Sequence, residues 1–365
     1  MKFSAPRETV LKPLQAVIGV VERKQTMPIL SNVLLVVRDG VLSVTATDLE
    51  VELIADVGVD DAVDGEITVP GRKLHDIVRA LPDGARVEAS LSGERMTVKA
   101  GRSRFTLSTL RAGDFPTVDD IEVQQALLVD AKALKHLLDK THFSMAQQDV
   151  RYYLNGLLLE TDGPKLRGVA TDGHRLALAE VALEAPAKRN EQQIVPRKGV
   201  LELSRLLDDE GKVDLIVGKN HLRVTTDGLR MTSKLIDGRF PDYGRVIPTS
   251  PENVVGADRQ LLRQALQRAA ILSNEKYRGV RLMLEEDTLT VEANNPEQEE
   301  AVEAVEVEYA GAPMEIGFNV NYLLDALGAI DSEQVRIGVT DSNSSCLITN
   351  ADDEGAKFVV MPMRL

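Results

Sequence analysis

The sequence is poor in the residues that build several common kinds of site. It has no tryptophan, aromatic residues make up 4% of its 365 residues, and Cys346 is its single cysteine. One cysteine cannot form an internal disulfide, so we expect a reducing compartment, the cytoplasm. No apolar run reaches the roughly 18 residues of a membrane span, and the N-terminus lacks the apolar core of a signal peptide. We therefore expect no membrane association.

Familiar catalytic and metal-binding motifs are also missing. The five histidines are scattered, no HExxH spacing occurs, and no Walker loop or GxGxxG follows a strand-like segment. His174 near Asp172 suggests a general base, but no nucleophile accompanies it. Asp48, Glu50 and Glu52 alternate along a strand-like stretch, which indicates a solvated strand face more readily than a metal site. We expect no catalytic residue, no cofactor and no metal.

The net charge is −14, from 57 acidic and 43 basic residues. In bulk, this balance argues against a nucleic-acid ligand, because phosphate contacts need Lys and Arg. The position of each sign matters more than the total. Basic residues gather in five of the six segments that we predict to be helices, whereas acidic residues concentrate in strands and loops. Such helices suit a phosphate backbone, although any one of them can be an ordinary solvated face.

Three markers recur in the same order along the chain. The first is a strand corner with Asp48, Asp172 and Asn295 at equivalent places, 124 and 123 residues apart. The second pairs VPGRKLHDIVRAL at 69–81 with VPRKGVLELSRLL at 195–207 and FNVNYLLDAL at 318–327. The third pairs RFTLSTLRAGDFP at 104–116 with RMTSKLIDGRFP at 230–241 and KFVVMPMRL at 357–365. The shared phase predicts three copies of one domain, at 1–121, 122–248 and 249–365.

Each copy is expected to hold one strand, one helix and three strands, repeated twice. Helices are predicted near 7–22, 71–81, 131–143, 197–207, 258–272 and 320–330. Strands of the first copy are predicted near 30–37, 41–47, 50–57, 66–69, 85–90, 95–100 and 103–109. Asp39-Gly40 indicates a hairpin turn, and Pro13 is expected to kink or interrupt the first helix. Short turns favour antiparallel sheets with helices on one face, an α+β fold.

Six helices in a chain suggest a ring made by two chains. Twelve helices, each about 10 Å wide, give a circumference of roughly 120 Å and a mean diameter of roughly 38 Å. Subtracting one helix width leaves a hole of about 30 Å, which admits a DNA duplex. Few aromatics and no zinc-finger or helix-turn-helix signature indicate DNA contacts that are independent of base sequence.

Several stretches closely resemble the bacterial DNA polymerase III beta subunit family, the DNA sliding clamps. They are FSMAQQDVRYYLNG at 143–156, VATDGHRLA at 169–177, IVPRKGVLEL at 194–203, ILSNEKYRGVRL at 271–282, ANNPEQEEA at 293–301 and VVMPMRL at 359–365. The resemblance spans the whole chain and is weakest in the loop at 57–66. It implies the DNA clamp fold, with sheets outside and helices inside, and a head-to-tail homodimer ring around duplex DNA. It also implies a non-catalytic processivity subunit of a DNA-directed DNA polymerase.

The resemblance further implies partners and a binding pocket. An ATP-driven clamp loader would place the ring on DNA, and the DNA polymerase catalytic subunit and other replication and repair proteins would bind through short linear peptides. We expect Met and Leu side chains of the pocket to adapt to varied partners, and Arg175, Arg245 and Arg364 to bind peptide backbone or acidic flanks. The implied hydrophobic pocket between the second and third domains comprises Leu154, Thr171, Gly173, His174, Arg175, Leu176, Pro241, Arg245, Val246, Ser345, Val359, Met361, Pro362, Met363 and Arg364.

Two other surfaces follow from the resemblance and from charge. The dimer interface is expected to join Lys99, Arg102, Arg104 and Phe105 of one end to Ile271, Leu272, Glu297, Glu299, Glu300 and Glu303 of the other. Opposite signs at opposite ends suit a closing head-to-tail contact. The residues expected to contact DNA are Lys24, Arg72, Lys73, Gln148, Tyr152, Tyr153, Arg197 and Lys198. Lys24 stands where the family often has Arg, so the charge is kept while a bidentate contact is lost.

Two other functions remain open on the sequence alone. One is a phosphodiesterase that uses Asp172 and His174. The other is a repeat scaffold that never meets DNA.

Overall fold

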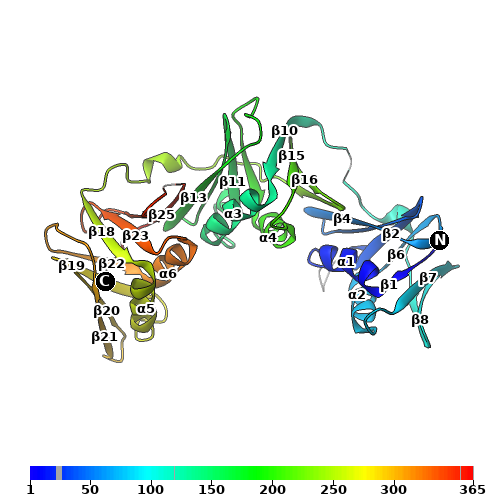
Figure 1. Ribbon diagram of the computed structural model, residues 1–365, viewed down its shortest axis with the longest axis horizontal. Coiled ribbons are helices and arrows are strands. Elements are labelled where there is room, and N and C mark those ends of the chain that lie inside the picture. Colours follow the sequence, from blue (N-terminus) through cyan, green and yellow to red (C-terminus); the bar gives the residue numbers. More distant parts are fainter. Residues whose placement is uncertain (22–26, 119, 354, 365) are drawn as a thin grey trace. The chain divides into compact units, whose positions relative to one another are not determined.

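The structure is a computed structural model, and it describes residues 1–21, 27–118, 120–353 and 355–364 (Figure 1). The chain divides into two compact units, and the middle third of the sequence contributes to both. Unit one comprises Met1–Lys132, Leu183–Lys188 and Lys198–Leu235. Unit two comprises Ala133–Ala182, Arg189–Arg197 and Ile236–Leu365.

The described residues form six α-helices, each within a few residues of its predicted place. They are α1 (Arg7–Val17), α2 (Gly71–Ala80), α3 (Ala131–Thr141), α4 (Arg197–Leu206), α5 (Arg259–Ala270) and α6 (Val320–Ala329). Helix α1 ends earlier than expected and continues as turns to Val21. Interruption of the helix at Pro13, one of the two expected outcomes, does not occur. The ring of Pro13 is buried, and a proline keeps a helical φ while removing one backbone hydrogen bond.

Unit one contains two antiparallel sheets. The eight-stranded sheet runs in the order β10 (Val123–Asp130), β15 (Lys212–Gly218), β16 (His221–Thr226), β17 (Leu229–Lys234), β4 (Val51–Gly58), β3 (Val41–Thr47), β2 (Asn32–Arg38) and β6 (Gly65–Pro70). The five-stranded sheet runs β5 (Asp60–Val63), β1 (Lys2–Pro6), β7 (Arg86–Ser92), β8 (Arg95–Ala100) and β9 (Ser103–Ser108). Strand β5 lies where the sequence suggested a loop. It pairs with β1, and the Ser4 hydroxyl donates to Asp61 at 2.6 Å.

Unit two also contains two antiparallel sheets. The eight-stranded sheet runs β14 (Gln192–Pro196), β11 (Gly156–Asp162), β12 (Lys165–Thr171), β13 (Arg175–Ala182), β25 (Ala356–Val360), β24 (Cys346–Asn350), β23 (Gln334–Val339) and β18 (Asn253–Asp258). The four-stranded sheet runs β21 (Glu300–Glu306), β20 (Thr288–Asn294), β19 (Gly279–Glu285) and β22 (Met314–Asn319). Short one-turn helices, η1 to η5, join some of these elements.

The three strand corners found in the sequence have the same physical role. The Asp48 side chain accepts backbone N–H bonds from Glu50 and Val51 at 2.9 and 2.8 Å. Asp172 accepts from the backbone of His174 and Arg175 at 2.9 and 3.1 Å, and Asn295 from that of Glu299 at 3.0 Å. A short acidic or amide side chain is suited to closing such turns. The recurring residues therefore mark the turn that precedes β4, β13 and β21.

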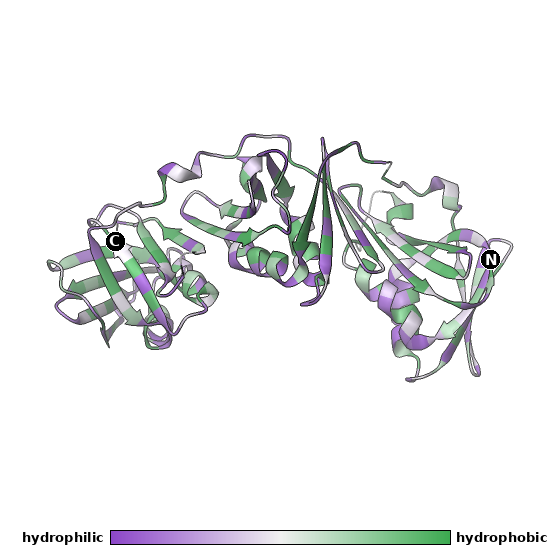
Figure 2. Cartoon of the chain, turned by 45° about the horizontal axis from the view of Figure 1, so that its top comes forward, coloured by the Kyte–Doolittle hydropathy of each residue, from purple (hydrophilic) through white to green (hydrophobic). Residues whose placement is uncertain are grey.

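Apolar side chains of strands and helices pack together within each unit. In unit one α1 packs on β3 and β4, and in unit two α5 packs on β20 and β21 (Figure 1). Leu14, Leu53, Leu266 and Val291 on these elements are buried. Figure 2 shows hydrophobic residues running along the strands. None of the described helices combines the length and the apolar character needed to cross a bilayer.

Each eight-stranded sheet joins four strands of one repeat to four strands of the next. In unit one the junction is β4 with β17, and in unit two it is β13 with β25. Glu52 lies directly opposite Thr232 in the first, and Leu176 directly opposite Val359 in the second. Alignment of the three markers makes these two residue pairs equivalent. Both junctions thus have one register.

Candidate functional site

A small apolar groove of about 170 Å³ lies in unit two, beside β13, β25 and the segment 240–247. Leu176 and Val359, the opposed pair of the β13–β25 junction, lie against it together with Leu154. All three are at least nine-tenths buried. The lining residues are Arg151, Leu154, Thr171, Gly173, Arg175, Leu176, Pro241, Asp242, Tyr243, Val246, Val359 and Met361.

One rim of the groove is the turn between β12 and β13. The Thr171 hydroxyl donates to the Arg175 carbonyl at 2.6 Å and accepts the Gly173 N–H at 3.1 Å. Gly173 has a φ of +90°, and a Cβ there would lie 2.9 Å from the Arg151 guanidinium. Glycine meets both demands because it tolerates positive φ and has no side chain.

Arg175 is held by the protein itself. It binds Asp172 at 3.1 Å, Asp325 at 2.5 Å and the Phe143 carbonyl at 2.7 Å. Its guanidinium also lies 4.5 Å from the centre of the Tyr322 ring. With these donors engaged, Arg175 shapes the groove and does not offer the free charge for acidic flanks that the sequence suggested. Arg364 is exposed at the C-terminus.

The structure brings together most, but not all, of the predicted pocket. Nine of the fifteen expected residues line the groove, and six do not: His174, Arg245, Ser345, Pro362, Met363 and Arg364. Of these, His174 is exposed on the neighbouring turn, where its carbonyl accepts the Met361 N–H at 2.9 Å. The prediction missed Arg151, Asp242 and Tyr243. Two of them, Asp242 and Tyr243, lie in the sequence between the predicted residues Pro241 and Arg245.

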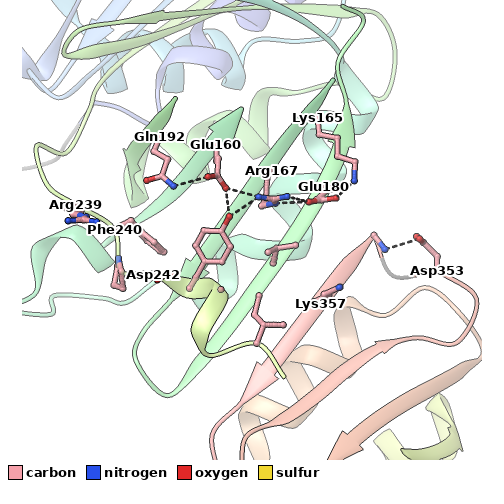
Figure 3. Close-up of a pocket in the computed structure, with 16 residues that line it drawn as sticks. Glu160, Lys165, Arg167, Glu180, Gln192, Arg239, Phe240, Asp242, Asp353 and Lys357 are labelled. Carbon is pink, nitrogen blue, oxygen red and sulfur yellow. Dashed lines mark hydrogen bonds and ion pairs between the residues drawn. The ribbon is translucent and has the colours of Figure 1, made fainter. Parts of the chain in front are cut away.

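A second, polar cavity of about 850 Å³ lies against the same segment 240–247 (Figure 3). Pro241, Asp242 and Tyr243 line both cavities. In the polar cavity, Arg167 contacts Glu160 and Glu180 on the neighbouring strands, at 2.9 and 2.6 Å. The charged side chains Glu160, Arg167 and Glu180 line this second cavity and not the apolar groove.

The predicted DNA contacts fall in different environments. Lys24 lies outside the described residues. The Arg72 guanidinium donates to the Val21 carbonyl, and Lys198 pairs with Asp48 at 2.5 Å. Arg197 donates to the Met145 carbonyl at 3.3 Å. The other predicted contacts are exposed or partly exposed side chains, namely Lys73, Gln148, Tyr152 and Tyr153.

Several cations of the helices also have structural partners. Arg7 binds Asp83 at 2.6 Å, and Arg268 binds Glu303 at 2.7 Å. Lys140 is buried and pairs with Asp331 at 2.6 Å. The bias of charge toward helices thus arises partly from contacts that hold the fold together.

The predicted dimer residues fall on or near two edge strands, β9 and β21, with Lys99 on the neighbouring strand β8 and Ile271 and Leu272 just after α5. Strand β9 ends the five-stranded sheet and β21 ends the four-stranded sheet, and among described residues each pairs with a strand on one side only. Ile271, at the end of α5, is 76% exposed, and Val302 on β21 is also exposed. Large exposed apolar side chains near an open strand edge are typical of an interface.

The side chains considered for catalysis take part in structural contacts. The Asp172 carboxylate binds backbone N–H groups and Arg175, and not the His174 ring. Among the described residues, no group of three His, Cys, Asp or Glu side chains converges to hold a metal. Cys346 is buried, and burial raises the pKa of its thiol to about 12, so the thiolate is scarce at neutral pH.

Family models match nearly the whole chain. The N-terminal, central and C-terminal domains of the DNA polymerase III beta subunit match residues 1–119, 128–242 and 244–364. The beta sliding clamp of Pseudomonas aeruginosa is 56% identical, and that of Escherichia coli K12 is 53% identical, each over all of both chains.

Solved structures agree. A Pseudomonas aeruginosa sliding clamp bound to griselimycin has 56% identity, a TM-score of 0.97 and complete coverage of both chains. A Caulobacter crescentus beta sliding clamp has 45% identity and a TM-score of 0.95, covering 100% of this chain and 99% of that one. The resemblance and the three-domain clamp fold are thereby confirmed. The chain belongs to the DNA polymerase III beta subunit family, and its function is that of a sliding clamp, a non-catalytic subunit that makes DNA polymerase processive.

Proposed function

We propose that two copies of this chain close a ring around duplex DNA by completing a third eight-stranded sheet. Both eight-stranded sheets have the same repeat-to-repeat order. Apart from β5, the remaining strands are the two halves of another such sheet: β1-β7-β8-β9 ends at β9, and β21-β20-β19-β22 ends at β21. Pairing β21 of one copy with β9 of the other reproduces the order of the two existing sheets. The match between this strand order and that of the two existing sheets is the main support for the ring.

The internal junctions also give the expected register. The repeat aligns Thr106 with Thr232. Strand pairing makes Glu300 the equivalent of Glu52, because Glu300 lies opposite Asn294 and Glu52 lies opposite Thr47, the residues just before the equivalent turn residues Asn295 and Asp48. Thr232 and Glu52 are directly opposed in the β4–β17 junction. The same register between copies places Thr106 opposite Glu300 and Phe105 opposite Ala301. Phe358 lies opposite Ala177 in the β13–β25 junction, so an aromatic facing alanine already has a precedent.

Charge and apolar exposure fit this closure. Near β9 the chain carries Arg102 and Arg104, and near β21 it carries Glu297, Glu299 and Glu300. Opposite charges at the two ends favour head-to-tail contact over self-contact of either end. Pairing would also cover Val302, and it brings Ile271 and Leu272 of one copy toward the Phe105 end of the other. Glu303 takes part through Arg268, its partner in α5.

Inside the ring, we propose that DNA is held without base readout. Exposed Lys73, Gln148 and Tyr152 supply phosphate and sugar contacts, with Lys24 and Tyr153, while Arg72, Arg197 and Lys198 contribute mainly through their charge. Such contacts have no preferred register along DNA, so the protein slides. We place this activity in the cytoplasm.

We further propose that the apolar groove is where partners bind. The DNA polymerase, the clamp loader and other replication and repair proteins would insert short extended peptides with apolar anchors. The groove has buried Leu154, Leu176 and Val359 for such anchors. Clamps of Pseudomonas aeruginosa and Bartonella birtlesii have been crystallised bound to griselimycin. We propose that this chain also binds griselimycin, and that it does so in the apolar groove described above.

The test of the ring is topological. The protein is loaded on nicked circular DNA with its clamp loader and ATP, and the circle is then cut once. We expect the protein to stay on the circle and to leave the linear molecule by sliding off its ends. Retention on linear DNA that depends only on salt would indicate an ordinary binder, and no retention on the circle would support the scaffold alternative.

A further inference from the structure

We propose that Tyr243 is a positioning residue for the partner groove: its hydroxyl fastens the segment 240–247, which forms one wall of the groove, to a row of charged side chains on the sheet beneath. The inference rests on the proposed function of the groove. Tyr243 lines the apolar groove and the polar cavity at once, so it lies at the boundary between them. A residue in this place can set the position of the wall without being a main anchor for the ligand.

The side chain of Tyr243 is attached at both ends. Its ring packs against the apolar cluster that contains Leu154, Leu176 and Val359. Its hydroxyl donates to the Glu160 carboxylate and accepts from the Arg167 guanidinium at 2.9 Å (Figure 3). The hydroxyl thus ties the segment to strands β11 and β12.

The register of four neighbouring strands brings the side chains of this row together. Gln192, Glu160, Arg167 and Glu180 are directly opposed, one after another, across β14, β11, β12 and β13. The Gln192 amide donates to Glu160 at 2.8 Å, and Arg167 bridges to Glu180 at 2.6 Å. Directly opposed cross-strand residues are close neighbours on one face of a sheet. Because four strands fix these side chains, the row is a firm support.

The row is electrostatically suited to hold a hydroxyl. Burial alone would raise the pKa of Glu160, but hydrogen bonds from Tyr243, Gln192 and Arg167 bring that pKa below its ordinary value. Glu160 is therefore ionised at neutral pH. A hydroxyl that donates to a carboxylate makes a shorter and stronger bond than one between neutral groups. Burial and the Glu160 bond raise the pKa of Tyr243 to about 12, so the donor proton is kept.

The segment needs this fastening because its neighbouring parts face outward. Pro241 and Gly244 are exposed, and Arg245 is 85% exposed and pairs with Asp242 inside the same segment. That local pair does not tie the wall to the sheet. Phe240 is buried in the apolar cluster, and Tyr243 and Ile247 pack against it. Tyr243 adds hydrogen bonds from its hydroxyl to the charged side chains of the sheet.

The first test removes only the hydroxyl. In Tyr243→Phe the ring can still pack on the apolar cluster, but the wall loses its bond to Glu160. We expect griselimycin to bind about tenfold more weakly, mainly through faster dissociation, because a hydrogen bond to a charged partner contributes on that scale. Surface plasmon resonance with the full-length protein measures the dissociation constant and both rates.

A second pair of variants asks whether Tyr243 acts through Glu160. Glu160→Gln keeps an oxygen that accepts the hydroxyl, and Gln192 can flip its amide to match, so binding is expected within about threefold of the unmodified protein. Glu160→Ala is expected to weaken binding as much as Tyr243→Phe. The double variant Glu160→Ala/Tyr243→Phe should then be no worse than either single one, because both remove the same contact.

The matched control is Tyr309→Phe. Tyr309 is a buried tyrosine of the same unit whose hydroxyl donates to the Ala312 carbonyl at 2.6 Å, and it does not line the groove. We expect its griselimycin affinity to be unchanged. If Tyr243→Phe and Glu160→Ala both bind like this control, the positioning role is wrong. If the unmodified protein does not bind griselimycin at all, the proposed groove itself is wrong and the inference falls with it.

Discussion

The two junctions inside the chain have the same strand register but different contents. In the β4–β17 junction, the opposed pair is Glu52 and Thr232, and the Val118 N–H donates to the buried Glu52 carboxylate at 2.9 Å. In the β13–β25 junction, the equivalent pair is Leu176 and Val359, beside the apolar groove. At the first junction, a hydrogen bond connects Glu52 to the segment that contains Val118. At the second, the apolar side chains of Leu176 and Val359 line the groove in which we propose that ligands bind. The two junctions thus share a register, and this pair of side chains is one difference between a structural junction and the proposed binding site.

The connecting segments follow the same division. Alignment of FPTV and FPDY makes Val118 the equivalent of Tyr243. At the first junction the segment is held by its backbone, through the Val118 N–H, and at the second it is held by a side-chain hydroxyl. Because the Tyr243 side chain makes the contact at the second junction, that contact does not use the backbone N–H of the segment beside the groove.

The largest effect is expected from moving the polar residue of the first junction into the second. Leu176→Glu places a carboxylate in the groove without the N–H donor that Glu52 has, and burying an unpaired charge is costly. We expect griselimycin affinity to fall by about 100-fold or more, measured by calorimetry. Thr232→Val, which gives the first junction the valine that Val359 supplies at the second, should leave binding unchanged. Equal binding by both variants would show that the apolar pair does not define the groove.

A smaller effect is expected from the cations that support each junction. Lys140 is buried, pairs with Asp331 and donates to the Ala329 carbonyl at the end of α6. Arg205 donates to the Ala16 carbonyl of α1 at 2.6 Å, but its side chain is 43% exposed. We expect Lys140→Ala to cost about 2 kcal/mol of stability and Arg205→Ala about 1 kcal/mol or less.

Urea unfolding followed by circular dichroism compares the two variants, with Lys140→Met as a control that keeps the apolar stem. A larger loss for Arg205→Ala than for Lys140→Ala would mean that exposure does not rank these contacts.

The smallest effect is a pH dependence confined to the first junction. Burial raises the pKa of Glu52 above its ordinary value of 4.5, although the Val118 N–H opposes the shift. A raised carboxyl pKa means that the folded state holds this proton more tightly than the unfolded state. The resulting stability is present at low pH and is lost as pH rises from the ordinary value through the raised one.

Glu52→Gln lacks this titration while keeping an acceptor for Val118. The melting temperature of the variant minus that of the unmodified protein should therefore rise across that pH window and then level off. A difference that stays flat from pH 4 to pH 8 would contradict a raised pKa for Glu52.

Much of the architecture was predictable because it repeats. Asp48, Asp172 and Asn295 close equivalent turns, so their spacing revealed the three copies, and the six helices lie close to their predicted ranges. Lys140 is one of the basic residues of the predicted helix 131–143, a type of helix that suits a phosphate backbone. Its partner Asp331 is 191 residues away, and such a pairing leaves no local pattern in the sequence. Tyr243 was missed because segment 240–247 has no periodicity. Its role depends on Glu160 and Arg167, which only strand register brings together.

In the proposed ring, β9 of one copy pairs with β21 of the other and completes a third sheet in the register of the first two. The most direct measurement is oxidation of the double variant Thr106→Cys/Glu300→Cys, followed by mass analysis under non-reducing, denaturing conditions. Directly opposed residues have Cβ atoms about 4.5–5.5 Å apart, near enough for a disulfide after slight adjustment. We predict a covalent dimer in high yield, and little from Thr106→Cys/Val302→Cys, which is displaced along the strand. Monomers alone, or equal yields from both variants, would contradict the account.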